Sequence, residues 1–435
     1  MKKFGLIAFA ALYGASFLCS CGDKKDNGVV VGKTTVDTDL SVEKRLELVM
    51  KYDDVKEFSE GLALVSEDDK CGFVDKEGNI AIPFVYDNAW SFSDGLACVF
   101  LNGKYGFIDE IGNCVIPCIY DYAFSFSDGL ARVVLCDKYG YIDKTGNQVI
   151  PCIYDYVGFV EDNCAIVQFD GKFGFVDQAG KQMIPCLYDG VGLFSEGMAS
   201  VCLNGKYGYV DKTGKLVVPF EYDGAFRFSD GLAMVKLDGR YGFVDKTGNL
   251  VISCVYDDAG YEGFSDGLAR VAVNGKWGFV DKTGKLVVPC EYDNTNGYSD
   301  GLAWVRLGYK YGFLDKTGKC IVPCEYDCAW DYSEGLARVF LDCKYGFIDN
   351  TGTLVIPLEY DFALDFSNGL TSVCIDGKYG CIDKNGNQII PCVYDDLDFA
   401  DLDIIMGLVL DSEENELKKC YHDVNGSLLY ELDLR

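Results

Sequence analysis

A Tyr-Asp pair returns along this chain at a nearly constant interval, and this periodicity restricts the possible folds more than any other feature of the sequence. The pairs begin at Tyr52, Tyr86, Tyr120, Tyr154, Tyr188, Tyr222, Tyr256, Tyr292, Tyr326, Tyr360 and Tyr394. The interval is 34 residues, except for one of 36 residues, where two extra residues lie in the Gly260–Gly263 loop. A fixed period of about 20–50 residues is typical of arrays in which each unit stacks on its neighbours. We therefore expect residues 52–393 to form ten repeats and residues 394–435 to form a degenerate eleventh repeat that caps the array.

Within one unit, the apolar pattern and the turn residues predict three strands. Apolar residues alternate through 232–237, which is the period of a strand with one buried face. Asp238 and Gly239 then form a favoured hairpin turn pair, and a Lys-Thr-Gly turn follows Asp245. All nine prolines occupy one position late in the unit, which marks the edge of a sheet because proline cannot donate to a strand ladder. Each unit is therefore predicted to be a three-stranded antiparallel meander.

These units predict an all-β tandem array that is open, curved or superhelical, and solenoid-like. Propellers usually contain about four to eight blades, fewer than the ten or eleven units of this chain. A closed β-propeller-like ring stays open as the alternative architecture. Stacked arrays present long surfaces, and such surfaces usually bind partners.

One unit carries a recognisable family motif. Residues 264–293 read FSDGLARVAVNGKWGFVDKTGKLVVPCEYD. This segment resembles the WG-repeat family, also described as KWG repeats, of bacterial envelope and other proteins. Only Trp277 supplies the family's tryptophan, and Tyr, Phe173 or Cys71 replaces it in the other units. The resemblance implies a repeat protein and implies little about a ligand or a reaction.

The N-terminus resembles a bacterial lipoprotein signal. Lys2 and Lys3 precede the apolar stretch 4–18, which is shorter than the roughly 20 residues that span a bilayer. Leu18-Cys19-Ser20-Cys21 then resembles a lipobox. We expect residues 1–20 to be a signal peptide, Cys21 to be lipidated, and residues 21–51 to form a flexible tether and an N-terminal cap. The resemblance implies a lipid-anchored protein of the bacterial cell envelope, on the periplasmic or surface-exposed side of the outer membrane, with its N-terminal lipid as its sole membrane contact. An ordinary signal peptide with an incidental cysteine is the alternative.

Composition excludes several classes of function. The chain has 39 Lys and Arg against 68 Asp and Glu, a formal net charge of −29, so nucleic acid is not an expected partner. Its one histidine, His422, leaves no room for a catalytic triad or a His-rich zinc site. The Asp-Lys-Thr-Gly segment matches a phosphorylation motif of ion pumps, but it occurs five times and reads as a turn. We expect no cofactor and no catalytic residue, and a hydrolase is the less favoured alternative.

Seven of the 21 cysteines share one repeat position: Cys118, Cys152, Cys186, Cys254, Cys290, Cys324 and Cys392. Phe84, Phe220 and Leu358 take this position in other units. Because phenylalanine and leucine neither bind metal nor form disulfides, the position reads as an apolar site that a small side chain can fill. Disulfides between neighbouring units and a metal site are the alternatives, and the sequence gives no connectivity.

Two positions vary strongly between units and form the candidate binding surface. One follows the Tyr-Asp pair and is often aromatic, as in Trp90, Phe124, Phe226 and Trp330. The other lies beside a valine that all ten units share, is expected to point outward, and carries Arg132, Arg270, Trp304 and Arg338. Variable residues on a constant scaffold are typical of a recognition surface, and equally of packing between repeats. The sequence thus predicts a non-catalytic scaffold for a protein or glycan partner, with a structural spacer as the alternative and the oligomeric state undetermined.

Overall fold

The computed structural model describes residues 48, 51–401, 404–410 and 416–433. The predicted signal peptide, Cys21 and most of the predicted tether and cap lie outside these residues. The described strands form eleven four-stranded antiparallel sheets, in which every strand pairs with its neighbours in sequence. The sheets span residues 54–86, 88–120, 122–154, 156–188, 190–222, 224–256, 258–292, 294–326, 328–360, 362–394 and 396–433.

The sixth sheet shows the common plan. It contains β21 (Gly224–Ser229), β22 (Leu232–Leu237), β23 (Arg240–Asp245) and β24 (Leu250–Tyr256). The last three strands are the predicted meander. The first strand was not predicted, and it comes from the segment that follows the Tyr-Asp pair. This strand is bulged in β21 and only two residues long in sheets such as the seventh, where it is β25 (Asp258–Ala259), so it carries no clear period-two pattern.

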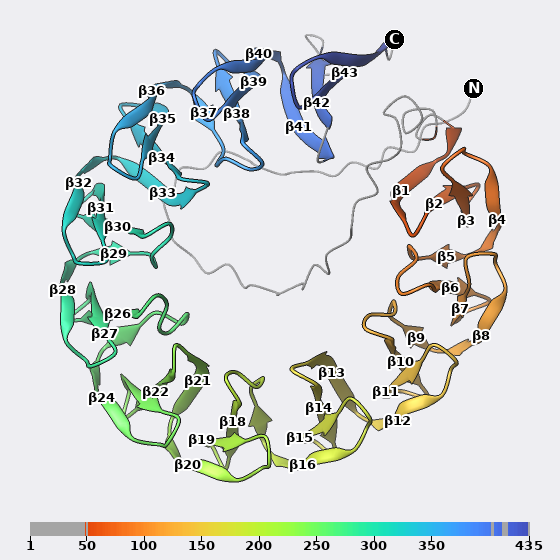
Figure 1. The fold of residues 1–435 in the computed structure, drawn as a ribbon, viewed down its shortest axis with the longest axis horizontal. Helices are drawn as coiled ribbons and strands as arrows, with labels where there is room; N and C mark the ends of the chain where they lie inside the picture. Colours follow the sequence, from red (N-terminus) through yellow and green to blue (C-terminus); the bar gives the residue numbers. More distant parts are fainter. Residues whose placement is uncertain (1–47, 49–50, 402–403, 411–415, 434–435) are drawn as a thin grey trace. The chain divides into compact units, whose positions relative to one another are not determined.

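The sheets follow one another in chain order along a curved row (Figure 1). Where Figure 1 labels both strands of one of the first ten sheets, the first strand lies on the inner side of the row and the fourth strand on the outer side. The prediction of an all-β, open and curved tandem array is confirmed. Within residues 394–435, predicted as a degenerate eleventh repeat that caps the array, the described strands from residue 396 to residue 433 form a four-stranded sheet.

The hydrophobic core is divided among the boundaries between neighbouring sheets. At the first boundary, Leu64 and Phe73 of one sheet pack against Ala89 and Val99 of the next. The valine shared by ten units is buried in each of them, as Val235 illustrates. Burying such a side chain contributes roughly 1.5–3 kcal/mol to stability. Because these side chains are buried at the boundaries between sheets, each sheet is stabilised mainly by contact with its two neighbours.

Turn geometry follows the predictions. Asp238 and Gly239 have φ angles of 50° and 79°, as a type I′ hairpin requires. Asn163, which replaces the glycine of the first turn in the fourth unit, has φ of 65°. In the last turn of the third sheet, Oδ1 of Asp143 accepts hydrogen bonds from the Thr145 hydroxyl at 2.7 Å and from the backbone N–H of Asn147 at 2.9 Å. The Thr145 hydroxyl bond is the largest of the effects that lower the pKa of Asp143 to about 2.

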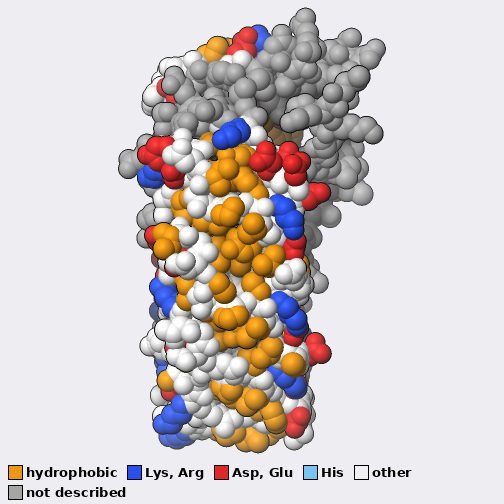
Figure 2. All heavy atoms as spheres, turned by 90° about the vertical axis from the view of Figure 1, so that its right-hand side faces the viewer, with side chains coloured by type: hydrophobic (Ala, Val, Ile, Leu, Met, Phe, Trp, Pro, Cys, Tyr) orange, Lys and Arg blue, Asp and Glu red, His pale blue; other side chains and the backbone are white. Residues whose placement is uncertain are grey.

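The outer strands carry the prolines, as expected for a sheet edge, and also carry exposed apolar side chains. Figure 2 shows these side chains as a band along one side of the array. Residues of β4 (Ile80–Tyr86), β8 (Cys114–Tyr120) and β12 (Gln148–Tyr154) contribute Ile80, Val85, Ile119 and Ile153. Pro83, Pro117 and Pro151 lie within these strands. A proline removes an N–H group and so discourages another chain from pairing with an exposed edge.

Candidate functional site

Polar residues that recur in most units connect neighbouring sheets, as the fifth sheet shows. The hydroxyl of Ser195 donates to the carbonyl of Phe228 in the next sheet at 2.6 Å. The carboxylate of Glu196 accepts the N–H of Gly231 at 3.1 Å and pairs with Lys246 at 2.9 Å. Both partners of Glu196 belong to the following sheet. These repeated acids are therefore engaged in structure, which leaves the variable positions as the candidates for recognition.

The two variable positions lie opposite each other in the same sheet. The N–H of Phe124 donates to the carbonyl of Arg132 at 3.0 Å, and that of Trp90 donates to the carbonyl of Cys98 at 3.0 Å. We call these two cross-strand positions the variable pair. The sequence showed them as separate patterns, because the short first strand that joins them was not recognised.

In the ninth sheet the variable pair is Trp330 in β33 (Cys328–Ser333) and Arg338 in β34 (Leu336–Leu341). The guanidinium carbon of Arg338 lies 4.0 Å from the centre of the Trp330 ring, within the range of a cation–π contact. Arg338 also forms an ion pair of 3.1 Å with Asp365 and donates to the carbonyl of Ala363, both from the next sheet. Burial lowers the pKa of Arg338.

In the third sheet Arg132 lies between two aromatic rings. Its guanidinium carbon is 3.9 Å from the centre of the Phe124 ring and 4.4 Å from that of Phe159, which belongs to the next sheet. Its Nη1 donates to the carbonyl of Val157 at 3.1 Å. Arg132 and Arg338 are each only 8% exposed, so the expectation that this strand position points outward is wrong for both. The reason is that both faces of every internal sheet are covered by a neighbouring sheet.

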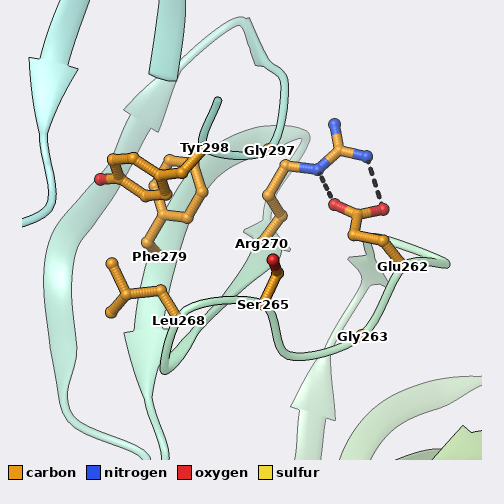
Figure 3. A pocket seen from close by; sticks show the side chains of 8 residues that line it. All are labelled: Glu262, Gly263, Ser265, Leu268, Arg270, Phe279, Gly297 and Tyr298. Carbon is orange, nitrogen blue, oxygen red and sulfur yellow. Dashed lines mark hydrogen bonds and ion pairs between the residues drawn. The ribbon is translucent and has the colours of Figure 1, made fainter. Parts of the chain in front are cut away.

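The seventh sheet holds Arg270 through the two extra residues of its unit. Nε and Nη2 of Arg270 bind the two carboxylate oxygens of Glu262 at 2.5 and 3.0 Å (Figure 3). Nη1 donates at 2.5 Å to the carbonyl of Thr295 in the eighth sheet. Gly263, Ser265 and Gly297 border this pair in a shallow pocket. The insertion was visible in the sequence, but its role as the partner of Arg270 was not predicted.

The eighth sheet connects Arg270 of the seventh sheet to the ninth sheet. Asn296 donates from its side chain to Asp331 at 2.7 Å. The ring of Trp304 lies 5.4 Å from that of Tyr311. Sheets seven to ten thus carry a continuous series of charged, amide and indole groups, which we call the polar–aromatic row: Glu262, Arg270, Asn296, Trp304, Trp330, Asp331, Arg338 and Asp365.

The two remaining aromatic candidates contact tyrosines. The ring of Trp90 is 5.6 Å from that of Tyr105, and the ring of Phe226 is 5.7 Å from that of Tyr261. Trp90, Phe124, Phe226, Trp304 and Trp330 are all half-buried. Each ring therefore packs within the array and still offers part of its surface to solvent.

The cysteines and acids were a further set of candidates for a metal site. Among the residues that the structure describes, no cysteine is joined in a disulfide, and no group of three His, Cys, Asp or Glu side chains is placed to hold a metal ion. The cysteine shared by seven units packs against the core, as Cys290 does at the sixth boundary, and burial raises the pKa of its thiol. Within the same residues, no helix has the length and apolar character needed to cross a bilayer.

Solved structures that resemble this chain share little sequence identity with it. A comparison with curated proteins gives no match. Among solved structures, a eukaryotic initiation factor is 11% identical with a TM-score of 0.38, over 71% of this chain and 96% of its own. The surface protein PorZ of the Porphyromonas gingivalis type-IX secretion system is 12% identical with a TM-score of 0.22, over 87% of this chain and 67% of its own. At these TM-scores neither likeness bears on function.

One family matches most of the sequence. The WG containing repeat is found in eleven consecutive segments that begin at residue 50 and end at residue 401. The boundaries between these segments fall in the third strand of each sheet, and the segments include the Tyr, Phe and Cys variants of the motif tryptophan. The chain therefore belongs to the WG containing repeat family.

Proposed function

We propose that this chain is a non-catalytic binding scaffold of the bacterial cell envelope. The observation that carries the proposal is the variable pair, which occupies one place on successive sheets and differs in chemistry from sheet to sheet. The constant polar residues are engaged between sheets, so the differences among units are concentrated where a partner could read them. A repeated acid that bridges sheets is also a poor candidate for a general acid or base.

The polar–aromatic row is the part of the array with the strongest recognition chemistry. Half-buried indole rings supply rigid contact area, and the exposed carboxylates of Asp331 and Asp365 can accept hydrogen bonds. Aromatic rings beside carboxylates suit a protein surface or the hydroxyl groups of a glycan. A structural spacer without a specific ligand is the second candidate, because Arg132 and Arg338 also connect neighbouring sheets.

The cellular location proposed here rests on the N-terminal sequence. A lipidated Cys21 would hold the scaffold at a membrane through its lipid, and the excess of acidic residues gives the protein no attraction to anionic headgroups.

Tryptophan fluorescence tests the binding proposal directly. Trp90, Trp304 and Trp330 are three of the four tryptophans, and all three lie at variable positions. Purified protein titrated with peptidoglycan fragments, and separately with glycans selected on an array, should show a saturable change in emission. Trp330→Ala should weaken that binding by about tenfold or more, as truncation of an interface aromatic commonly does.

The matched control is Tyr309→Ala. Tyr309 lies in a hairpin turn and is 93% exposed, so it is an aromatic residue outside the variable pairs. Equal losses in both variants, or no ligand that responds to any variable position, would favour the structural spacer.

A further inference from the structure

Among the fourth strands of the first ten sheets, β24 is the one with a serine at the proline position. Nine units place a proline in this strand, and the sixth unit places Ser253 there. A proline on an edge strand prevents another strand from pairing with it, because the ring removes the N–H donor. The sixth unit therefore has a backbone donor at the position where the other nine units have none.

Pairing within the sixth sheet does not require that donor. The register between β23 and β24 shifts on both sides of Gly242. Because nine units place a proline at the position of Ser253, the pairing of the third and fourth strands does not use an N–H group there. Ser253 itself is exposed. The carbonyl of Val255 already accepts a hydrogen bond from Arg240 at 2.9 Å, so the proposed edge is centred on Val251 and Ser253.

Several apolar side chains of β24 are also exposed to solvent. Leu250, Val251 and Val255 are 43%, 39% and 52% exposed. The neighbouring outer strands β20 (Leu216–Tyr222) and β28 (Leu286–Tyr292) carry a proline and, at the position equivalent to Val255, exposed Glu221 and Glu291. Charged side chains and prolines are the usual means by which an edge strand is kept from pairing with another chain. The strands β20 and β28 have both, and β24 has neither.

We propose that β24 is a docking edge for an extended segment of a partner protein, which adds to the sixth sheet as a fifth strand. Apolar residues of that segment would cover Val251 and Val255, and flanking lysine or arginine residues would suit the acidic surface to which the exposed Glu221 and Glu291 of the neighbouring outer strands belong. Charge selects this occupant over a second copy of the chain. A pair of β24 strands from two copies would bring together molecules that each carry a net charge of −29.

This edge lies on the outer side of the curved row, whereas β33, which carries Trp330, lies on the inner side (Figure 1). The inference is therefore independent of the proposed function, and variants of Trp330 and of Ser253 separate the two sites.

Fluorescence polarisation with a defined probe tests the inference. The probe is a short labelled peptide of alternating valine and threonine with lysines at both ends, added to the full-length protein at low salt. Ser253→Pro should weaken binding by about tenfold or more, because the donor is lost and the proline ring obstructs the edge. Ser253→Ala keeps the N–H and should bind as the wild type does, and Trp330→Ala should have no effect on this probe.

Three outcomes would overturn the inference. The first is equal affinity of the wild type and Ser253→Pro, with circular dichroism showing that both are folded. The second is failure of the wild type to bind the probe while it forms a dimer that Ser253→Pro abolishes in sedimentation, which would identify a second copy as the occupant. The third is that the wild type binds a probe with N-methyl groups along one edge as tightly as it binds the unmodified probe. Strand pairing requires the N–H groups that N-methylation removes. This last measurement does not depend on the folding of any variant.

Discussion

Lys206 and Asp223 form an ion pair of 2.6 Å at the boundary between the fifth and sixth sheets. Oδ1 of Asp223 accepts from the lysine, which begins the second hairpin strand of the fifth sheet, and Oδ2 accepts the N–H of Asp238 in the hairpin turn of the sixth sheet at 2.8 Å. The lysine lowers the pKa of Asp223. One carboxylate thus ties the hairpins of two sheets together, which explains why the Tyr-Asp pair marks the period of the sequence.

Acid should destabilise the array through its turn and bridging aspartates. Asp143 has a pKa of about 2 in the folded protein, below the value of about 3.9 for an unfolded chain. Its contribution is therefore fully present above about pH 4 and is lost as the pH falls toward 2. The melting temperature should fall more steeply between pH 5 and pH 3 for the wild type than for Asp143→Asn.

Comparing the two proteins at each pH corrects for a second effect of acid. Protonation also reduces the repulsion among the many carboxylates, and this change is nearly the same in both. Parallel melting curves would show that the Asp143 turn does not contribute.

Truncation of the constant valine should have a local effect. Val235 is buried with Tyr209 and Val218 of the fifth sheet, so Val235→Ala should cost about 2 kcal/mol at that boundary. In a nearest-neighbour array, hydrogen exchange should accelerate in sheets five to seven and stay unchanged in sheets one and two. Uniform acceleration from residue 54 to residue 394 would instead indicate one cooperative unit.

Membrane attachment is tested by Cys21→Ser. If Cys21 is lipidated, this variant should move from the membrane fraction to the soluble fraction, and its signal peptide should be cleaved more slowly. Cys19→Ser is the matched control, because it removes a neighbouring thiol and leaves Cys21 in place. Retention of the Cys21→Ser protein in detergent-extracted membranes would contradict the anchor.

Sequence reasoning predicted what depends on local chemistry and missed what depends on stacking. The hairpin at Asp238, the positive φ of Asn163 and the burial of Val235 follow from turn preferences and from a period of two. The burial of Arg132 was missed because the alternation of residues along a strand distinguishes its two faces but does not reveal that a neighbouring sheet covers each face. Phe159, which completes its site, lies in another unit.

The contact between Trp330 and Arg338 allows recognition to be separated from inter-sheet packing. A cation–π contact at 4.0 Å with a largely buried guanidinium should contribute about 1 kcal/mol. A double-mutant cycle of Trp330→Ala and Arg338→Met, measured by chemical denaturation, should therefore give a coupling energy of that size, whereas independent residues would give additive effects. Trp330→Phe keeps a ring over the arginine and should retain most of the stability.

Ligand binding then decides the role of the indole. If the coupling is present but ligand-induced fluorescence changes are the same in Trp330→Phe and Trp330→Ala, the indole contributes to packing within the array and not to ligand binding. If Trp330→Phe is stable and binds much more weakly than the wild type, the indole surface that faces solvent is the part that a partner reads.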